Sequence, residues 1–91
     1  MTPKQILIND LRRELRWAYK DQSTDNIGRL TKSVTALVHE GDETARPVAM
    51  AAAAYVFFLK AVKRQINDET MRNVRVHARI LVDRLRSWEA A

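Results

Sequence analysis

Residues 47–59 read PVAMAAAAYVFFL, and this uncharged run of 13 residues decides the fold. Alanines stand at its centre and aromatic residues follow, so a helix built from it is apolar on almost every side. Such a helix must be covered by neighbours over most of its circumference. Because a membrane span takes roughly 20 apolar residues, the run predicts a core helix and no membrane span.

The flanks of this run set the bounds of the predicted helix. Thr44 is a residue type favoured at the N-cap, and Pro47 is tolerated within a first turn. The apolar pattern continues to Ile66, which gives a helix over residues 45–66. Gly41 precedes this helix, and we expect it to end the previous one in a left-handed conformation.

Apolar residues at helical spacing predict three more helices, over residues 3–20, 25–40 and 68–89. Ser23 or Thr24 suits the N-cap of the second helix, and Asn67 suits that of the last. The three apolar stripes consist of Leu7, Ile8, Leu11, Leu15, Ala18 and Tyr19, then Ile27, Leu30, Val34, Leu37 and Val38, then Met71, Val74, Ala78, Leu81, Leu85 and Trp88.

Residues 45–66 and 68–89 could instead form one long helix, but the apolar spacing argues against this. The stripe of helix 45–66 should recur near residues 69–70 and 73, whereas the next apolar residues are Met71 and Val74. This stripe consists of Val48, Ala52, Tyr55, Leu59, Val62 and Ile66. The phase therefore breaks where a turn would lie. Short connections favour antiparallel neighbours. We predict a single all-α domain over residues 1–91, a four-helix up-and-down bundle with helix 45–66 at its centre.

The composition limits the chemistry of the chain. Hydrophobic residues make up 46% and charged residues 30%, as is typical of a globular domain. No cysteine is present, which excludes disulfides, thiolate metal sites and a cysteine nucleophile. The N-terminus leads directly into a polar helix pattern without the apolar region of a signal peptide, so we expect a cytoplasmic protein.

No catalytic or metal-binding pattern is recognisable. His39 and His77 belong to neither an HExxH nor an ExxH pattern, and the two glycines form no phosphate-binding loop. Asp42 and Glu43 fit a solvated turn better than a pair of catalytic carboxylates. The sequence therefore predicts that the protein is not an enzyme and holds no cofactor.

The formal net charge of +5 favours acidic partners, and basic side chains gather on two helical faces. Those of the last helix fall within about 60° at about 100° per residue. Tryptophan and arginine are enriched in binding hot spots, so we predict a partner-binding role for both faces. Alternatively, arginine stems cover the edge of the core, and the tryptophan packs against a nearby loop or a dimer partner. The residues are Arg12, Arg13, Arg16, Lys20 and the neighbouring Trp17, then Arg72, Arg75, Arg79 and Arg86.

Apolar side chains are more numerous than one thin bundle can bury. Val76 and Ile80 lie on the side of the last helix away from its stripe, and helix 45–66 contributes Met50, Phe57 and Phe58. We interpret these five residues as a dimer or secondary apolar contact and predict a homodimer. The alternative is that three neighbouring helices bury helix 45–66 within one subunit.

Two functions fit these surfaces. The first is a small non-catalytic protein-interaction module, a regulator, adaptor or inhibitor that binds an acidic protein surface. The alternative is a nucleic-acid-binding protein that contacts the phosphate backbone through both arginine faces. A helix that reads bases exposes asparagine or glutamine among its arginines, and residues 68–89 offer little beyond Asn73. We therefore favour protein recognition.

Overall fold

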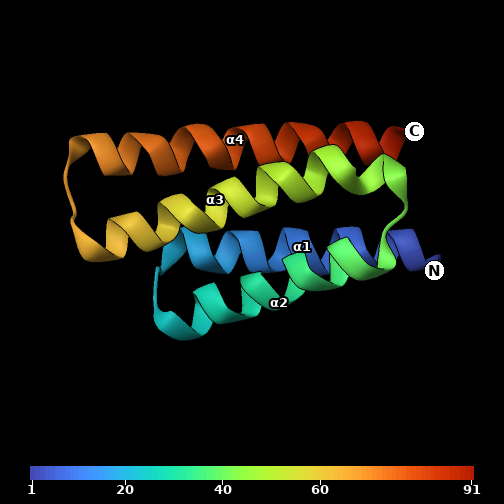
Figure 1. Ribbon diagram of the computed structural model, residues 1–91, viewed down its shortest axis with the longest axis horizontal. Helices are drawn as coiled ribbons and strands as arrows, with labels where there is room; N and C mark the ends of the chain where they lie inside the picture. Colours follow the sequence, from blue (N-terminus) through green and yellow to red (C-terminus); the bar gives the residue numbers. More distant parts are fainter.

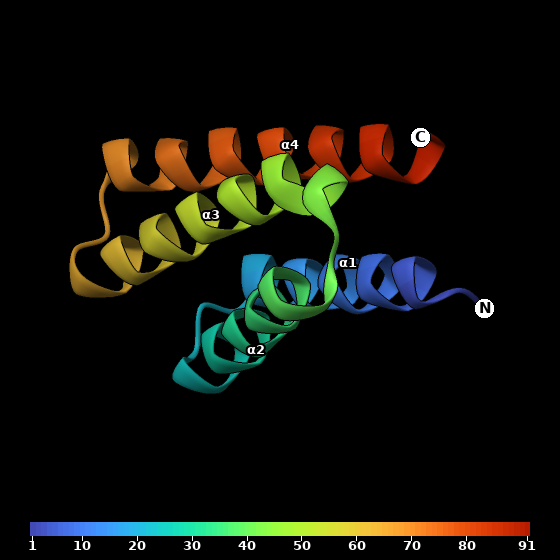
Figure 2. The same cartoon turned by 45° about the vertical axis from the view of Figure 1, so that its right-hand side comes forward.

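The computed structural model describes residues 1–91 as four α-helices and one 3₁₀ turn. The helices form two stacked hairpins, α1 with α2 and α3 with α4, and both chain ends lie at the same end of the molecule (Figures 1 and 2). Consecutive helices pack together, and α4 also contacts α1. The predicted all-α, four-helix, up-and-down bundle is confirmed. The elements are α1 Pro3–Lys20, α2 Thr24–Glu40, η1 Glu43–Ala45, α3 Arg46–Arg64 and α4 Asp68–Ala90.

Short capped links produce the two hairpins. The Ser23 hydroxyl accepts a hydrogen bond from the Asn26 backbone N–H at 3.2 Å, which caps the start of α2. Asn67 and Thr70 form a reciprocal capping box at the start of α4. Both predicted caps are confirmed, and links this short hold consecutive helices antiparallel.

Two predicted features at the ends of α3 are wrong. The helix ends at Arg64 instead of Ile66, because the backbone of Gln65 is extended, with φ −150° and ψ 111°. Thr44 is not the N-cap of α3 but part of η1, whose own cap is the Asp42 carboxylate. The Thr44 hydroxyl instead accepts a hydrogen bond from the Trp88 indole N–H at 2.8 Å. The Asp42 cap, which also accepts from the Thr44 hydroxyl, and the tertiary contact with Trp88 together hold this turn.

Gly41 follows α2, but its backbone is extended and not left-handed, with φ −76° and ψ 151°. The glycine is required by close packing instead. A Cβ at this position would lie 2.6 Å from the Leu37 carbonyl oxygen and 2.8 Å from the Ala45 Cβ. The chain therefore turns from α2 into η1 through a space that admits no side chain.

We expect Gly41→Ala to destabilise the fold by about 1–3 kcal/mol, the usual cost of forcing extra atoms into a tight contact. Gly28→Ala is the matched control, because nothing lies within 4 Å of a Cβ built there. Replacing this helical glycine should instead stabilise the fold by about 0.5–1 kcal/mol. Urea unfolding followed by circular dichroism measures both changes, and a shift of the same sign in the two variants contradicts this interpretation.

The core lies between the two hairpins and contains one buried face from each helix. Tyr55 on α3 is fully buried, and its hydroxyl donates to the Leu15 carbonyl oxygen of α1 at 3.4 Å. Most members of the four predicted stripes are buried; the exceptions include Tyr19 and Val38, which are 43% and 59% exposed. From α3 the core takes Val48, Ala52, Tyr55, Val56, Leu59 and Val62.

The outer side of α3 is not covered, which corrects the expectation that neighbours bury this helix over most of its circumference. α3 packs on α2 and α4, while Met50 and Phe57 on its outer side are each 66% exposed. In a bundle of four helices each helix has two close neighbours, so one side of each faces outwards. α3 has more apolar side chains than its two neighbouring helices bury.

Glu43–Arg64 is long and apolar enough to cross a membrane, judged by length and composition alone. Its most apolar window of 18 residues has a mean hydropathy of 1.4, and 33% of that window is buried in the fold. This range is longer than the uncharged run 47–59 because apolar residues also occur on either side of that run. Core helices of soluble proteins meet the same criterion, so a membrane span does not follow from it.

Candidate functional site

α1 and α4 enclose a groove of about 490 Å³ that brings both predicted basic faces together. Arg16 of α1 lies in it with three arginines of α4, and we call it the basic groove. At about 100° per residue, positions four and seven apart on α4 return to nearly the same side of the helix. The lining residues are Leu15, Arg16, Tyr19, Arg75, Ala78, Arg79, Val82, Asp83 and Arg86.

The floor of the basic groove is apolar and its rim is charged. Leu15 is buried, and Ala78 and Val82 are half-buried against the core. Four arginines against one aspartate leave a net charge of +3 on the lining residues. None of these guanidinium groups has a carboxylate of the chain within 4.0 Å, because the ion pairs of the protein all involve other residues. The groove therefore presents uncompensated positive charge around an apolar surface.

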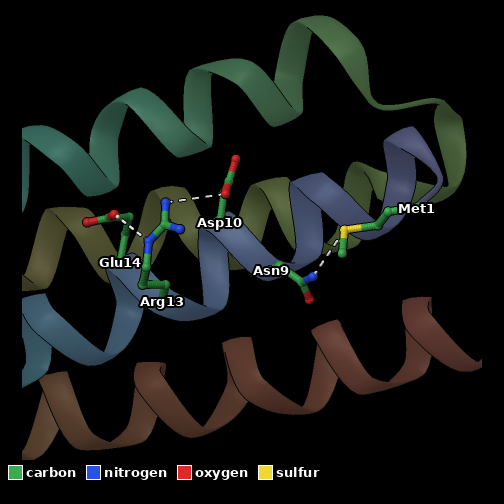
Figure 3. A network of polar contacts seen from close by, with 5 residues as sticks. All are labelled: Met1, Asn9, Asp10, Arg13 and Glu14. Carbon is green, nitrogen blue, oxygen red and sulfur yellow. Dashed lines mark hydrogen bonds and ion pairs between the residues drawn. The ribbon is translucent and has the colours of Figure 1, made fainter.

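Two of the predicted partner-binding arginines are engaged within the chain. Arg12 Nη2 donates to Glu89 Oε1 at 3.0 Å and so joins α1 to the last turn of α4. This hydrogen bond is the main reason that the pKa of Glu89 lies below its usual value. Arg13 lies between Asp10 and Glu14, at 3.3 Å and 3.1 Å (Figure 3). The basic groove contains neither of these two arginines.

Glu14 is the one buried charged residue of the core, and the sequence pattern did not single it out. Its Oε1 atom accepts from Arg13 Nε, while the buried Oε2 atom has no hydrogen-bond partner. Figure 3 shows Asn9 on a different side of α1, where its amide contacts the Met1 sulfur at 3.5 Å. The Arg13 guanidinium thus serves to compensate a carboxylate of its own helix.

Trp17 is 54% exposed on α1, so it is not buried against the neighbouring loop. The Lys20 ammonium lies 5.9 Å from the centre of its ring, within cation–π range. A second depression of about 430 Å³ follows this side of α1 and includes Arg16, which also lines the basic groove. The surface around Trp17 therefore continues into the basic groove through Arg16. The residues of the depression are Asn9, Arg12, Arg13, Arg16, Trp17 and Lys20.

Arg72 lies outside the basic groove, closer to the start of α4. It lines a neighbouring depression of about 380 Å³ together with Arg75 and Arg79, which belong to both. The same depression includes Val76 and Ile80, which are 46% and 39% exposed. The arginine face of α4 thus separates the basic groove from a more apolar side of this helix.

Phe58 is not part of the exposed apolar surface, contrary to the sequence-based interpretation. It is half-buried and stacks on His77 of α4, with ring centroids 4.1 Å apart. Phe57 makes an edge contact with Phe58 and stays 66% exposed, like Met50. The predicted apolar contact residues therefore divide into Met50 and Phe57 on α3, Val76 and Ile80 on α4, and an inward Phe58.

The groove itself could not be found from the sequence, because it exists only where α1 and α4 meet. Tyr19 lies at its rim and Asp83 within its lining, and neither was predicted as a site residue. The one available signal was the position of Tyr19 at the edge of the apolar stripe, one turn after Arg16. Asp83 falls among the arginines of α4 on a helical wheel and lowers the charge of that face.

The fold and groove define a small all-α domain with an unpaired arginine cluster between its first and last helices. No group of three histidine, aspartate or glutamate side chains is arranged to hold a metal ion. No protein family matches the chain, and neither a curated protein nor a solved structure is similar to it.

Proposed function

We propose that this protein is a non-catalytic interaction module whose basic groove binds an acidic, partly apolar segment of a partner protein. One observation carries the proposal: four arginines without a carboxylate partner in the chain surround an apolar floor. Protein interfaces typically combine an apolar centre with a polar rim. An amphipathic helix laid between two helices satisfies both parts at once.

The chemistry of the rim suits carboxylates. A guanidinium group presents a planar set of donors that binds a carboxylate through two parallel hydrogen bonds. Arg16 on α1 faces the arginines of α4 across the groove, so glutamates on both sides of a bound helix would find donors. Tyr19 and Trp17 add exposed aromatic surface next to Arg16, of the type that is enriched in binding hot spots.

The second candidate is binding to the phosphate backbone of a nucleic acid, which the length of the arginine face favours. From Arg72 to Arg86 this face extends about 21 Å along α4 at about 1.5 Å per residue. Several phosphates of one strand fit such a length. The apolar floor has no role in phosphate binding, whereas the apolar side of a partner helix can cover it. We therefore place protein recognition first.

The test is the paired charge reversal Arg75→Glu with Arg79→Glu, assayed by fluorescence anisotropy. The probes are a labelled helical peptide with one glutamate face and one leucine face, and labelled random-sequence duplex and single-stranded DNA. We expect the parent to bind the peptide with a micromolar Kd. The variant should bind it about 100-fold more weakly, because each lost charge-assisted hydrogen bond contributes about 1.5 kcal/mol.

The matched control is Arg29→Glu with Lys32→Glu, which changes the net charge equally on exposed positions of α2. This control should weaken peptide binding by less than about threefold, an effect of overall charge alone. Equal losses in the two variants would contradict recognition by the groove. Tighter binding of DNA, with an affinity that falls steeply between about 50 and about 200 mM salt, would replace the proposal with the nucleic-acid candidate.

A further inference from the structure

The outer side of α3 carries an apolar surface separate from the basic groove. Its members are spaced by three and four residues, which places them on one side of the helix as in a coiled-coil seam. Met50 and Phe57 project from it, with smaller alanines between and beyond them. We call this surface, Met50, Ala53, Ala54, Phe57 and Ala61, the α3 face. An exposed apolar stripe on a small domain is the kind of surface that interfaces use.

Grooves flank the α3 face on both sides. The groove towards α2 has a volume of about 360 Å³ and includes Val38, which is 59% exposed. The groove towards α4 has a volume of about 650 Å³ and includes Ile80. Met50 lines both, so it stands on a ridge between two partly apolar hollows. Helices pack by placing such ridges into such grooves.

The charges at the two ends of α3 have opposite signs. Asp42 and Glu43, just before α3, outnumber Arg46, its first residue, so the N-terminal end carries a net charge of −1. Lys60, Lys63 and Arg64 give the C-terminal end a net charge of +3. None of these side chains forms an ion pair within the chain. A helix that approaches antiparallel with the same charge distribution would therefore meet complementary charge at both ends, whereas a parallel copy would meet like charge.

We propose that the α3 face binds a second copy of this chain in an antiparallel, two-fold symmetric helix pair. With the symmetry axis between Ala53 and Ala54, residues equally distant from that point face each other. Met50 of one copy then packs against Phe57 of the other, and Glu43 lies opposite Arg64. The alanines at the axis let the two backbones approach closely. Such a contact uses the same patch on both subunits, as two-fold dimers do.

In this register Arg46 falls opposite Ala61 and Lys60 falls opposite Pro47, so no two basic side chains are directly opposed. Arg46 lies one residue, about 1.5 Å along the helix, from Lys60 of the other copy. The basic groove lies between α1 and α4, whereas α3 packs mainly on α2 and α4. A dimer would therefore leave two basic grooves open, which would raise the avidity for a partner with repeated acidic segments.

The test is sedimentation equilibrium of the full chain from low to several hundred micromolar, with circular dichroism to verify that each variant folds. We expect the parent to dimerise with a micromolar Kd. Phe57→Glu should weaken the dimer about tenfold or more, since it places a charge against Met50 inside the apolar contact. Ile6→Glu, at a position on α1 that is 47% exposed, is the matched control and should leave the dimer unchanged.

A charge swap tests the antiparallel register. Glu43→Arg and Arg64→Glu should each weaken the dimer about threefold or more, and the double variant should restore the parental Kd. Failure of the double variant to restore it would overturn the register. A parent that stays monomeric throughout, or a dimer insensitive to Phe57→Glu, would overturn the proposal.

A lipid surface is the competing occupant of the α3 face. Sedimentation of the parent with phosphatidylcholine–phosphatidylglycerol vesicles separates the two cases. Binding to vesicles by a monomeric parent, lost in Phe57→Glu, would assign this face to a membrane instead. The Arg75→Glu with Arg79→Glu variant should dimerise like the parent, so failure of the dimer and failure of the proposed peptide binding are distinguishable.

Discussion

Tyr55→Ala should lower the free energy of unfolding by about 3–5 kcal/mol, the range for removing a large aromatic side chain from a packed core. Tyr55 is fully buried between the two hairpins, and its hydroxyl reaches the Leu15 carbonyl oxygen of α1 at 3.4 Å. The cavity would lie between two hairpins whose tightly packed side chains collapse only partly. A chain of this length has a total stability of about 5–14 kcal/mol, so the variant should be close to unfolding. Urea denaturation measures the change, and a loss below about 1 kcal/mol would contradict the central role of this ring.

Tyr55→Phe separates the ring from the hydroxyl group. The hydrogen bond is long, so its removal should change the stability by less than about 1 kcal/mol at neutral pH. Burial, with a smaller effect of Tyr19, raises the pKa of Tyr55 above its ordinary value of 10.0. The folded state thus favours the neutral phenol, and the resulting stability is fully present below pH 10 and is lost as the pH rises further. The parent should therefore lose more stability than Tyr55→Phe above this pH, and parallel pH profiles would contradict the raised pKa.

Trp88→Ala should also lower the stability by about 3–5 kcal/mol. Trp88 is 4% exposed near the end of α4, and its indole N–H donates to the Thr44 hydroxyl of η1 at 2.8 Å. The Lys4 ammonium lies 5.3 Å from the centre of its ring. This side chain therefore joins the last turn of α4 to the link between the hairpins and to the start of α1. Urea denaturation followed by circular dichroism checks the value.

The control for this prediction is Trp88→Phe, which keeps an aromatic ring and loses the N–H donor. We expect a loss of about 1–2 kcal/mol, from the hydrogen bond and the smaller ring together. If both variants lost the same amount, the hydrogen bond and not the packing would account for the effect. A change below about 1 kcal/mol in Trp88→Ala would show that the two hairpins do not depend on this contact.

The spacing of apolar residues predicted most of the fold, because the side of a helix that becomes buried is set by residues a few positions apart. The stripe from Met71 to Trp88 predicted which side of α4 is buried, and Val74, Leu81 and Leu85 are all in the core. Asn67 was recognisable as a cap because its side chain bonds a backbone group three residues later. Each of these signals is contained within a few turns of one helix.

Features that depend on distant segments were predicted poorly. Thr44 was predicted as the N-cap of α3, but its hydroxyl accepts from Trp88, which lies 44 residues later in the sequence. Gly41 is a local exception: it was interpreted by its conformational freedom, whereas the Leu37 carbonyl oxygen and the Ala45 Cβ, four residues before and after it, leave no room for a side chain. Phe58 looked like surplus apolar surface because nothing near it in the sequence indicates that His77 will stack on its ring.

Local patterns along the chain predict four helices, the stripe that each one buries, and a row of arginines along α4 next to its stripe. The packing of the helices is what places Arg16 in a groove with Arg75 and Arg79, pairs Arg12 and Arg13 with carboxylates, and leaves an apolar side of α3 exposed. The physical reason is range: a helix face depends on residues three and four apart, whereas a groove depends on which helices become neighbours. No local pattern relates α1 to α4.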